Sequence, residues 1–199
     1  KSFEIIKGEL GEEFVSRYPA DALPVLCRVI HTTADFSYRD TLTITEGAIG
    51  LAKEAIHRGL PIITDTTMAA SGINKTAARK FGIDVHCFIG DEDVKEAAKA
   101  SGMTRSAVSA EKAARLYSEC IYAVGNAPTA LMRLYELIEE KKIRPALIIG
   151  VPVGFVNVVE AKELILRTDV PTIVARGRKG GSNIAAAICN ALLYEAGGR

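Results

Sequence analysis

The chain has 199 residues, of which 48% are hydrophobic and 25% are charged, proportions that exclude disordered, collagen-like and low-complexity proteins. Its 25 basic and 24 acidic side chains nearly cancel, and only 6% of its residues are aromatic, so we expect no nucleic-acid partner. No apolar run approaches the roughly 20 residues that cross a bilayer, so we expect no membrane partner either. The composition predicts a single domain over residues 1–199.

The start of the sequence and its cysteines bear on the compartment. The chain begins at Lys1 without a methionine, so we expect residues to be missing before it, with a removed targeting segment as an open alternative. The four cysteines form no CxxC pair, which argues against a zinc site and a dithiol redox motif. The simplest interpretation is small buried side chains in a cytoplasmic protein. These cysteines are Cys27, Cys87, Cys120 and Cys189.

Five short apolar, β-branched runs are typical of strands buried on both faces, as in a parallel sheet covered by helices. They lie at residues 61–64, 83–89, 120–124, 146–150 and 171–175. Helical patterns separate or follow them, at residues 105–118, 127–141 and 182–196. Before residue 60 the chain is expected to be mainly two helices, one carrying Val25–Ile30 and one over residues 46–58. We therefore predict an α/β fold: a three-layer α/β/α sandwich with a mainly parallel five-stranded sheet and a helical N-terminal segment.

Ligands of such folds bind at the carboxyl ends of the strands. The best anion-binding candidate there is Arg176–Asn183, where three cationic side chains precede a Gly-Gly-Ser turn into a helix. A solvated strand-to-helix turn explains this segment equally well. Arg105, in the first turn of its expected helix, opposes the helix dipole, which indicates either a ligand contact or an ordinary surface arginine. Pro152–Val156 is an apolar loop suited to a large flat ligand, whereas Asn126–Thr129 is explained by helix capping alone.

Common catalytic motifs are missing from the chain. It contains no GxGxxG after the first strand, no P-loop, no GxSxG nucleophile elbow and no HExxH metal motif. Of its three histidines, His57 suits a helix C-terminus and His86 suits a hydrogen-bonded core position. His31 ends an apolar helical stripe, where a capping role and a proton-transfer role both remain open. The residues alone thus predict a partly apolar, carboxylate-bearing ligand near one histidine.

Six motifs in order along nearly the whole chain resemble the precorrin-8X (cobalt-precorrin-8) methylmutases of cobalamin biosynthesis. They are Ile30–Asp35 (IHTTAD), Pro61–Asp65 (PIITD, followed by Met68 and Gly72-Ile73), Thr104–Ala107 (TRSA), Gly125–Leu131 (GNAPTAL), Gly150–Val156 (GVPVGFV) and Arg176–Ser182 (RGRKGGS).

The resemblance implies an isomerase that moves a methyl group from C11 to C12 of a tetrapyrrole, precorrin-8 or cobalt-precorrin-8, giving hydrogenobyrinate or cobyrinate. It implies no cofactor and no metal, a homodimer with the site near the subunit boundary, and His31 as the catalytic general acid. It also implies that Arg105 pairs with a substrate carboxylate. Asn74 replaces the threonine common in relatives, and Arg39 lies about one position from a family arginine. The expected substrate-binding residues are Ser2, Arg39, Asn74, Thr104, Arg105, Asn126, Thr129, Arg176, Gly181 and Ser182.

Two other functions stay open. A non-catalytic corrinoid-binding carrier would keep the anion contacts without needing a titrating histidine, and the retained His31 favours the enzyme over it. A flavodoxin-like or Rossmann nucleotide binder is disfavoured by the missing glycine motif, and nucleotide-dependent thermal stabilisation would reveal one.

Overall fold

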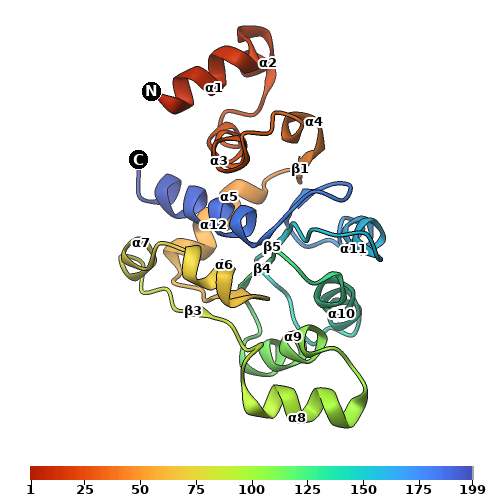
Figure 1. Cartoon of the computed structure of the whole chain (residues 1–199). Coiled ribbons are helices and arrows are strands. Elements are labelled where there is room, and N and C mark those ends of the chain that lie inside the picture. The colour runs from red at the N-terminus through yellow and green to blue at the C-terminus, as the bar shows by residue number, and fades with distance from the viewer. Residues whose placement is uncertain (199) are drawn as a thin grey trace.

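A six-stranded sheet in the order β1-β6-β5-β4-β2-β3 lies at the centre of the computed structural model, which describes residues 1–198 (Figure 1). Every pairing in it is parallel except β1 with β6. The strands are β1 (Leu42–Ile44), β2 (Ile62–Thr64), β3 (Val85–His86), β4 (Ile121–Val124), β5 (Leu147–Gly150) and β6 (Thr172–Ala175). The α/β/α sandwich with a mainly parallel sheet is confirmed, and the predicted count of five strands is wrong by one.

Helices cover both faces of the sheet. On one face, α12 (Ser182–Ala196) packs against α5 (Ala48–His57), α6 (Thr67–Gly72) and α3 (Leu23–Thr33). On the other, α10 (Pro128–Glu139) lies between α9 (Arg105–Leu116) and α11 (Val158–Ile165), and α8 (Glu92–Ser101) packs on α9. Neighbouring residues of one strand enter opposite cores, since Ile121 contacts the α12 side and Tyr122 the α10 side. Because side chains on both faces of such a strand are buried, its sequence is a continuous apolar run.

Helix α12 is covered on two sides, by the sheet and by α3, and this explains its composition. Nine of its residues are buried, including the consecutive alanines 185–187. Small side chains allow close contact: a Cβ added to Gly72 of α6 would lie 2.8 Å from the Cβ of Ala186. The predicted helix over 182–196 coincides with α12.

The N-terminal segment is more divided than expected. It holds α1 (Ser2–Leu10), α2 (Glu12–Arg17) and α4 (Tyr38–Thr41) besides α3 and α5, and α7 (Lys75–Arg79) follows α6. Strand β1 was missed because three residues are too few to show an alternating pattern. It is held at the sheet edge by backbone bonds such as Arg176 N to Thr41 O, 2.8 Å. Figure 1 shows α1 and α2 at one end of the molecule and α8 at the other.

The cysteines of the described chain are free thiols, and three of them are buried. None of the helices within residues 1–198 is long and apolar enough to cross a membrane.

Candidate functional site

The loops after β2 and β4 are joined through one buried carboxylate. Asp65, directly after β2, accepts hydrogen bonds of 2.8 Å from the backbone N–H groups of Gly125, Asn126 and Ala127. Burial raises the pKa of this carboxyl, and the three N–H donors act in the opposite direction. Asp65 thereby fixes the loop that leads into α10 and carries the predicted residues Asn126 and Thr129.

The start of α12 lies directly against that loop. A Cβ on Gly125 would stand 2.6 Å from the Cα of Ser182, so only glycine allows this approach. The Ser182 hydroxyl lies 2.7 Å from that of Thr66, the residue that caps α6. The ends of β2, β4 and the β6–α12 loop therefore meet at one place, as predicted for the carboxyl edge of the sheet.

The β6–α12 loop, residues 176–181, is built around a buried lysine. The Lys162 side chain of α11 is fully buried, and its Nζ donates hydrogen bonds of 2.8 Å to the carbonyl oxygens of Gly177 and Lys179. Burial lowers the pKa of Lys162 to about 8. The Gly181 N–H donates to Val151 O at 2.8 Å, which holds the far end of the loop on β5. With these carbonyls turned inward, the side chains of Arg178 and Lys179 are exposed.

Lys179 connects this loop to the end of α3. Its Nζ lies 2.6 Å from Asp35 Oδ2 and 3.0 Å from Ser37 Oγ. The hydrogen bond from Lys179, followed by those from Ser37, lowers the pKa of Asp35 to about 2. Asp35 follows Ala34, whose φ of 53° ends α3 just beyond His31. The cationic loop and the histidine-bearing helix are therefore joined by an ion pair.

His31 lies in the last turn of α3 with its side chain exposed, and its ring meets Phe3 of α1 edge-on at 5.6 Å. It opens onto a cavity of about 280 Å³ between α3, the end of α6 and α12. The lining residues are Arg28, His31, Thr32, Gly72, Asn183, Ala186, Ala187, Asn190 and Tyr194. Asn183, the residue after Ser182, lines this cavity, so the first turn of α12 lies beside the cavity that His31 lines.

Other predicted residues lie at the starts of helices. Asn74 caps α7 by accepting from Ala77 N at 3.0 Å, and its Nδ2 donates to Tyr194 Oη at 3.0 Å. Thr104 caps α9, and its hydroxyl donates to that of Thr129 at 2.9 Å. This bond pairs the starts of α9 and α10, so Thr104 and Thr129 are neighbours although 25 positions apart.

The predicted arginines differ in how much of their charge is already paired. Arg176 makes a two-pronged ion pair with Glu163 of α11, at 2.8 and 2.6 Å. Arg39 contacts Asp40 at 3.3 Å and lies over the Phe14 ring. Arg105 is exposed at the start of α9. Arg105 is thus better placed than Arg176 or Arg39 to meet a carboxylate ligand. Ser2, the first residue of α1, is exposed beside Phe3, the neighbour of His31.

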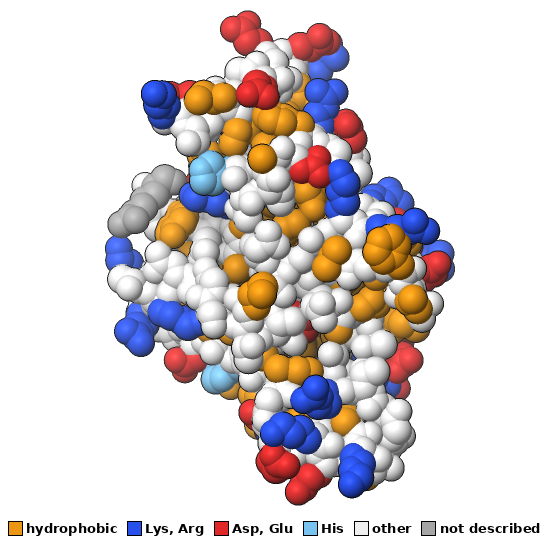
Figure 2. All heavy atoms as spheres, in the orientation of Figure 1, with side chains coloured by type: hydrophobic (Ala, Val, Ile, Leu, Met, Phe, Trp, Pro, Cys, Tyr) orange, Lys and Arg blue, Asp and Glu red, His pale blue; other side chains and the backbone are white. Residues whose placement is uncertain are grey.

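An exposed apolar loop lies next to the cationic one. Val153, Phe155 and Val156 expose 47%, 83% and 76% of their surface, and the Arg178 guanidinium lies 5.6 Å from the Phe155 ring centre. Figure 2 shows hydrophobic side chains gathered beside basic ones at the right of the molecule, over α11 of Figure 1. An apolar surface next to a cationic one suits a ligand that has both apolar and anionic groups.

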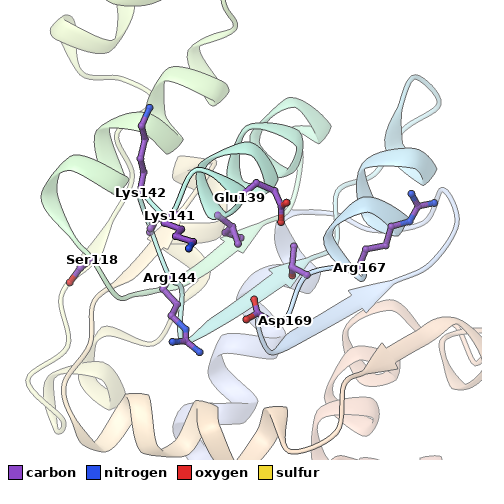
Figure 3. A pocket seen from close by; sticks show the side chains of 10 residues that line it. Ser118, Glu139, Lys141, Lys142, Arg144, Arg167 and Asp169 are labelled. Carbon is purple, nitrogen blue, oxygen red and sulfur yellow. The ribbon is translucent and has the colours of Figure 1, made fainter.

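The cleft of about 700 Å³ in Figure 3 is a different place. It lies beside the segments that enter β4, β5 and β6, at the amino edge of the sheet, with Ser118, Arg144 and Asp169 among its lining. Its cations do not converge, since Lys142 and Arg167 point away from each other (Figure 3). Volume alone therefore does not mark the functional site.

Sequence reasoning did not predict the roles of Asp65, Lys162 and Arg28 or the pairing of Asp35 with Lys179. Asp65 carried a signal, since it is a carboxylate directly after a buried strand. Lys162 carried none, because one lysine in an amphipathic helix is ordinary. Within residues 1–198 no cluster of histidine, cysteine or acidic side chains could hold a metal ion. The site combines one exposed imidazole, several cations and capped helix starts, which together can bind a polyanion and transfer a proton.

Comparison with known proteins gives one consistent result. The sequence pattern of the precorrin-8X methylmutase family matches residues 1–195. A cobalt-precorrin-8 methylmutase of Leptospira interrogans is 44% identical, over 97% of this chain and 90% of its own. A precorrin-8X methylmutase of Pseudomonas aeruginosa is 36% identical, over 98% of this chain and 93% of its own. The solved structure of the precorrin-8x methyl mutase from Thermus thermophilus superposes with a TM-score of 0.88 at 37% identity, over 99% of this chain and 96% of that one. The chain belongs to the precorrin-8X methylmutase family.

Proposed function

We propose that the cavity beside His31 binds precorrin-8 or cobalt-precorrin-8 and that His31 is the general acid for migration of a methyl group from C11 to C12. As a family member the chain is a methylmutase, an isomerase of cobalamin biosynthesis. The observation that carries the histidine assignment is position: His31 is exposed at the mouth of a cavity that cationic and polar segments surround.

The proposed reaction balances within one molecule. His31 donates a proton to the conjugated ring system near C11, the methyl group moves to C12 with its bonding electrons, and a proton returns to the imidazole. Substrate and product are isomers, so the step consumes no methyl donor and no oxidant. The remaining contribution of the protein is to hold one tautomer of a flexible macrocycle in the reactive geometry.

Recognition of the substrate rests on its carboxylate side chains. Arg105 offers an exposed guanidinium, and Gly181 and Ser182 begin the long helix α12, whose first N–H groups favour anions. Asn126, Thr104 and Thr129 add polar groups at the starts of α9 and α10. The apolar loop with Phe155 offers a surface for the face of the macrocycle.

The finer assignments belong to the same proposal. Relatives carry both the cobalt-precorrin-8 and the precorrin-8X name, so both substrates are included. We also propose a cytoplasmic homodimer with the site near the subunit boundary, in agreement with the exposed Phe155 and Val156.

The test is anaerobic incubation of wild type, His31→Ala and His57→Ala with each of the two substrates, followed by visible spectroscopy. His57 is the matched control because it is exposed, its ring hydrogen-bonds to Lys53 O of its own helix and it meets the Phe81 ring edge-on, away from the His31 cavity. We expect wild type and His57→Ala to produce the corrin spectrum, and His31→Ala to bind without converting. Binding without conversion by the wild type would favour the carrier. Conversion by His31→Ala at the wild-type rate would support the isomerase activity but refute the assignment of His31 as the general acid.

A further inference from the structure

A second charged residue of α3 lines the His31 cavity. Arg28 lies three positions before His31, hence on the same side of the helix. Its guanidinium lies over two rings, with Cζ 4.8 Å from the centre of Phe3 and 5.2 Å from that of Tyr194. Phe3 is also the ring that His31 meets edge-on. One aromatic side chain therefore contacts both the arginine and the imidazole.

The aromatic clamp is fixed by hydrogen bonds rather than by packing alone. Tyr194 Oη accepts from Asn74 Nδ2 at 3.0 Å, and the backbone N–H of Asn74 donates to Asn190 Oδ1 at 2.7 Å. Asn190 in turn donates to Gly72 O at 2.9 Å. These bonds hold Tyr194 in place and with it one face of the Arg28 guanidinium, so the group is oriented before any ligand arrives.

The charge of Arg28 is not neutralised within the described part of the chain. No carboxylate among residues 1–198 forms an ion pair with it, and its Nε is buried without a hydrogen-bond partner. Glu195 lines a neighbouring cavity together with Arg28, and its carboxylate pairs with Lys53 at 4.0 Å. A guanidinium that lies against two aromatic rings keeps its terminal N–H donors, which match a carboxylate in two parallel hydrogen bonds.

We propose that Arg28 binds one carboxylate side chain of the tetrapyrrole in the plane of its guanidinium and so sets the position of the macrocycle relative to His31. This rests on the proposed function, since it assumes a polycarboxylate in the His31 cavity. Asn74 then acts on the substrate indirectly, as a positioning residue that holds Tyr194 against Arg28. The class of ligand is a planar macrocycle with flexible carboxylate arms.

The experiment compares Arg28→Met and Arg28→Lys with wild type and with Arg115→Met, an exposed arginine at the end of α9 on the opposite face of the sheet. For Arg28→Met we expect KM to rise about ten- to hundredfold, the size of one charge-assisted pair, with a smaller change in kcat. Arg28→Lys keeps the charge but lacks the planar guanidinium, so its KM should lie between those of wild type and Arg28→Met. Arg115→Met should match wild type. Circular dichroism and thermal unfolding establish that each variant folds.

A second measurement separates binding from a structural role. Hydrogenobyrinate and its single-amide forms are titrated into wild type and Arg28→Met by visible absorbance. One amide form should bind wild type more weakly than hydrogenobyrinate does. The same amide form should bind Arg28→Met no more weakly than hydrogenobyrinate does, because the substitution has already removed the ion pair that the amide breaks. Equal KM values for wild type and Arg28→Met would overturn the inference. So would affinity losses from the amide and from the substitution that add for every amide form. In either case, conversion of the substrate by wild type would still support the proposed function. If Arg28→Met loses binding while wild type binds but does not convert the substrate, the Arg28 site is supported and the isomerase proposal fails.

Discussion

The Asp35 carboxylate lies 2.6 Å from Lys179 Nζ, so two segments 144 positions apart are joined beside His31. One partner ends the histidine-bearing helix, and the other belongs to the cationic loop before α12. Lys179 exposes 58% of its side chain, and exposed pairs contribute at most about 1 kcal/mol to stability. The pair therefore matters more for where the loop lies than for whether the protein folds.

We predict that Asp35→Asn lowers kcat/KM several-fold while changing the free energy of unfolding by less than about 1 kcal/mol. The reason is that Lys179 is released and the loop loses its fixed distance to His31. Lys179→Met should have a similar effect, and the double variant should be no worse than either alone. Additive losses in this cycle would show that the two side chains act separately.

The same pair has a defined pH dependence. The pKa of Asp35 is lowered to about 2 from an ordinary 3.8, so the folded state binds this proton less tightly than the unfolded state. Its stabilising contribution is complete above the ordinary value and is lost as pH falls toward about 2. Carboxyl titration by NMR should give a midpoint well below the ordinary one in wild type and a higher midpoint in Lys179→Met, where only the hydrogen bonds from Ser37 still lower the pKa of Asp35. A normal midpoint in wild type would contradict the contact.

Lys162 gives a pH dependence of the same sign in the alkaline range, because its pKa is also lowered on folding. Its pKa is lowered to about 8 from 10.5, so the unfolded state holds more protons between these values. The contribution of Lys162 to stability therefore rises with pH from about 8 to 10.5. The thiols of the buried Cys27 and the half-buried Cys87, with raised pKa values, act against this rise. The contribution of Lys162 is isolated by subtracting the free energy of unfolding of Lys162→Met from that of wild type, measured by denaturant unfolding from about pH 8 to 10.5.

Lys162→Met should also reduce activity. Methionine keeps the length of the side chain and leaves the carbonyl oxygens of Gly177 and Lys179 without their donor, so the loop relaxes. We expect kcat/KM to fall about tenfold, equivalent to about 1.4 kcal/mol. The control is Lys95→Met, an exposed lysine of α8 paired with Glu92. Wild-type activity in Lys162→Met would mean that the loop keeps its shape without the buried amine.

The fold was largely predictable because its core strands and α12 carry long, regular patterns. Residues 182–196 repeat apolar side chains at helical spacing, and β4 and β5 are continuous apolar runs. Strand β1 was not predictable, since it is three residues long and is ordered by pairing with β6, where Leu42 lies opposite Ala175, 133 positions later in the chain. Long-range pairing of so short a segment leaves no local pattern.

The candidate site was predictable only in its loops. Turn residues at the strand ends marked where ligands bind, and the structure brings Gly125, Thr66 and Ser182 together there. The Arg28 clamp was not visible, because its two rings come from opposite ends of the chain, Phe3 and Tyr194. Such contacts depend on how α1, α3 and α12 pack, which no local spacing encodes. The role of each predicted substrate-binding residue stays a prediction.

Asp65→Asn tests the organisation of the loop after β4. One carboxylate oxygen accepts from Gly125 N and the other from both Asn126 N and Ala127 N. An amide replaces one acceptor with a donor, so at least one N–H loses its partner. We expect a loss of about 1–3 kcal/mol in the free energy of unfolding, with Asp84→Asn, an exposed aspartate, unchanged. Equal denaturation midpoints for wild type and Asp65→Asn would refute the contact.

Gly125→Ala tests the close approach of two strand-end loops directly. The new Cβ would lie 2.6 Å from the Cα of Ser182 and 2.9 Å from its N, both backbone atoms that cannot turn aside. Either α12 or the loop must shift, at a cost of about 1–3 kcal/mol, and the shift moves the anion-binding start of α12 relative to His31. We therefore expect lower stability together with a higher KM. Gly90→Ala is the matched control, because a Cβ there meets nothing within 4 Å. A Gly125→Ala protein with wild-type Tm and KM would show that Ser182 is free to move, and the start of α12 would then have no fixed place in substrate binding.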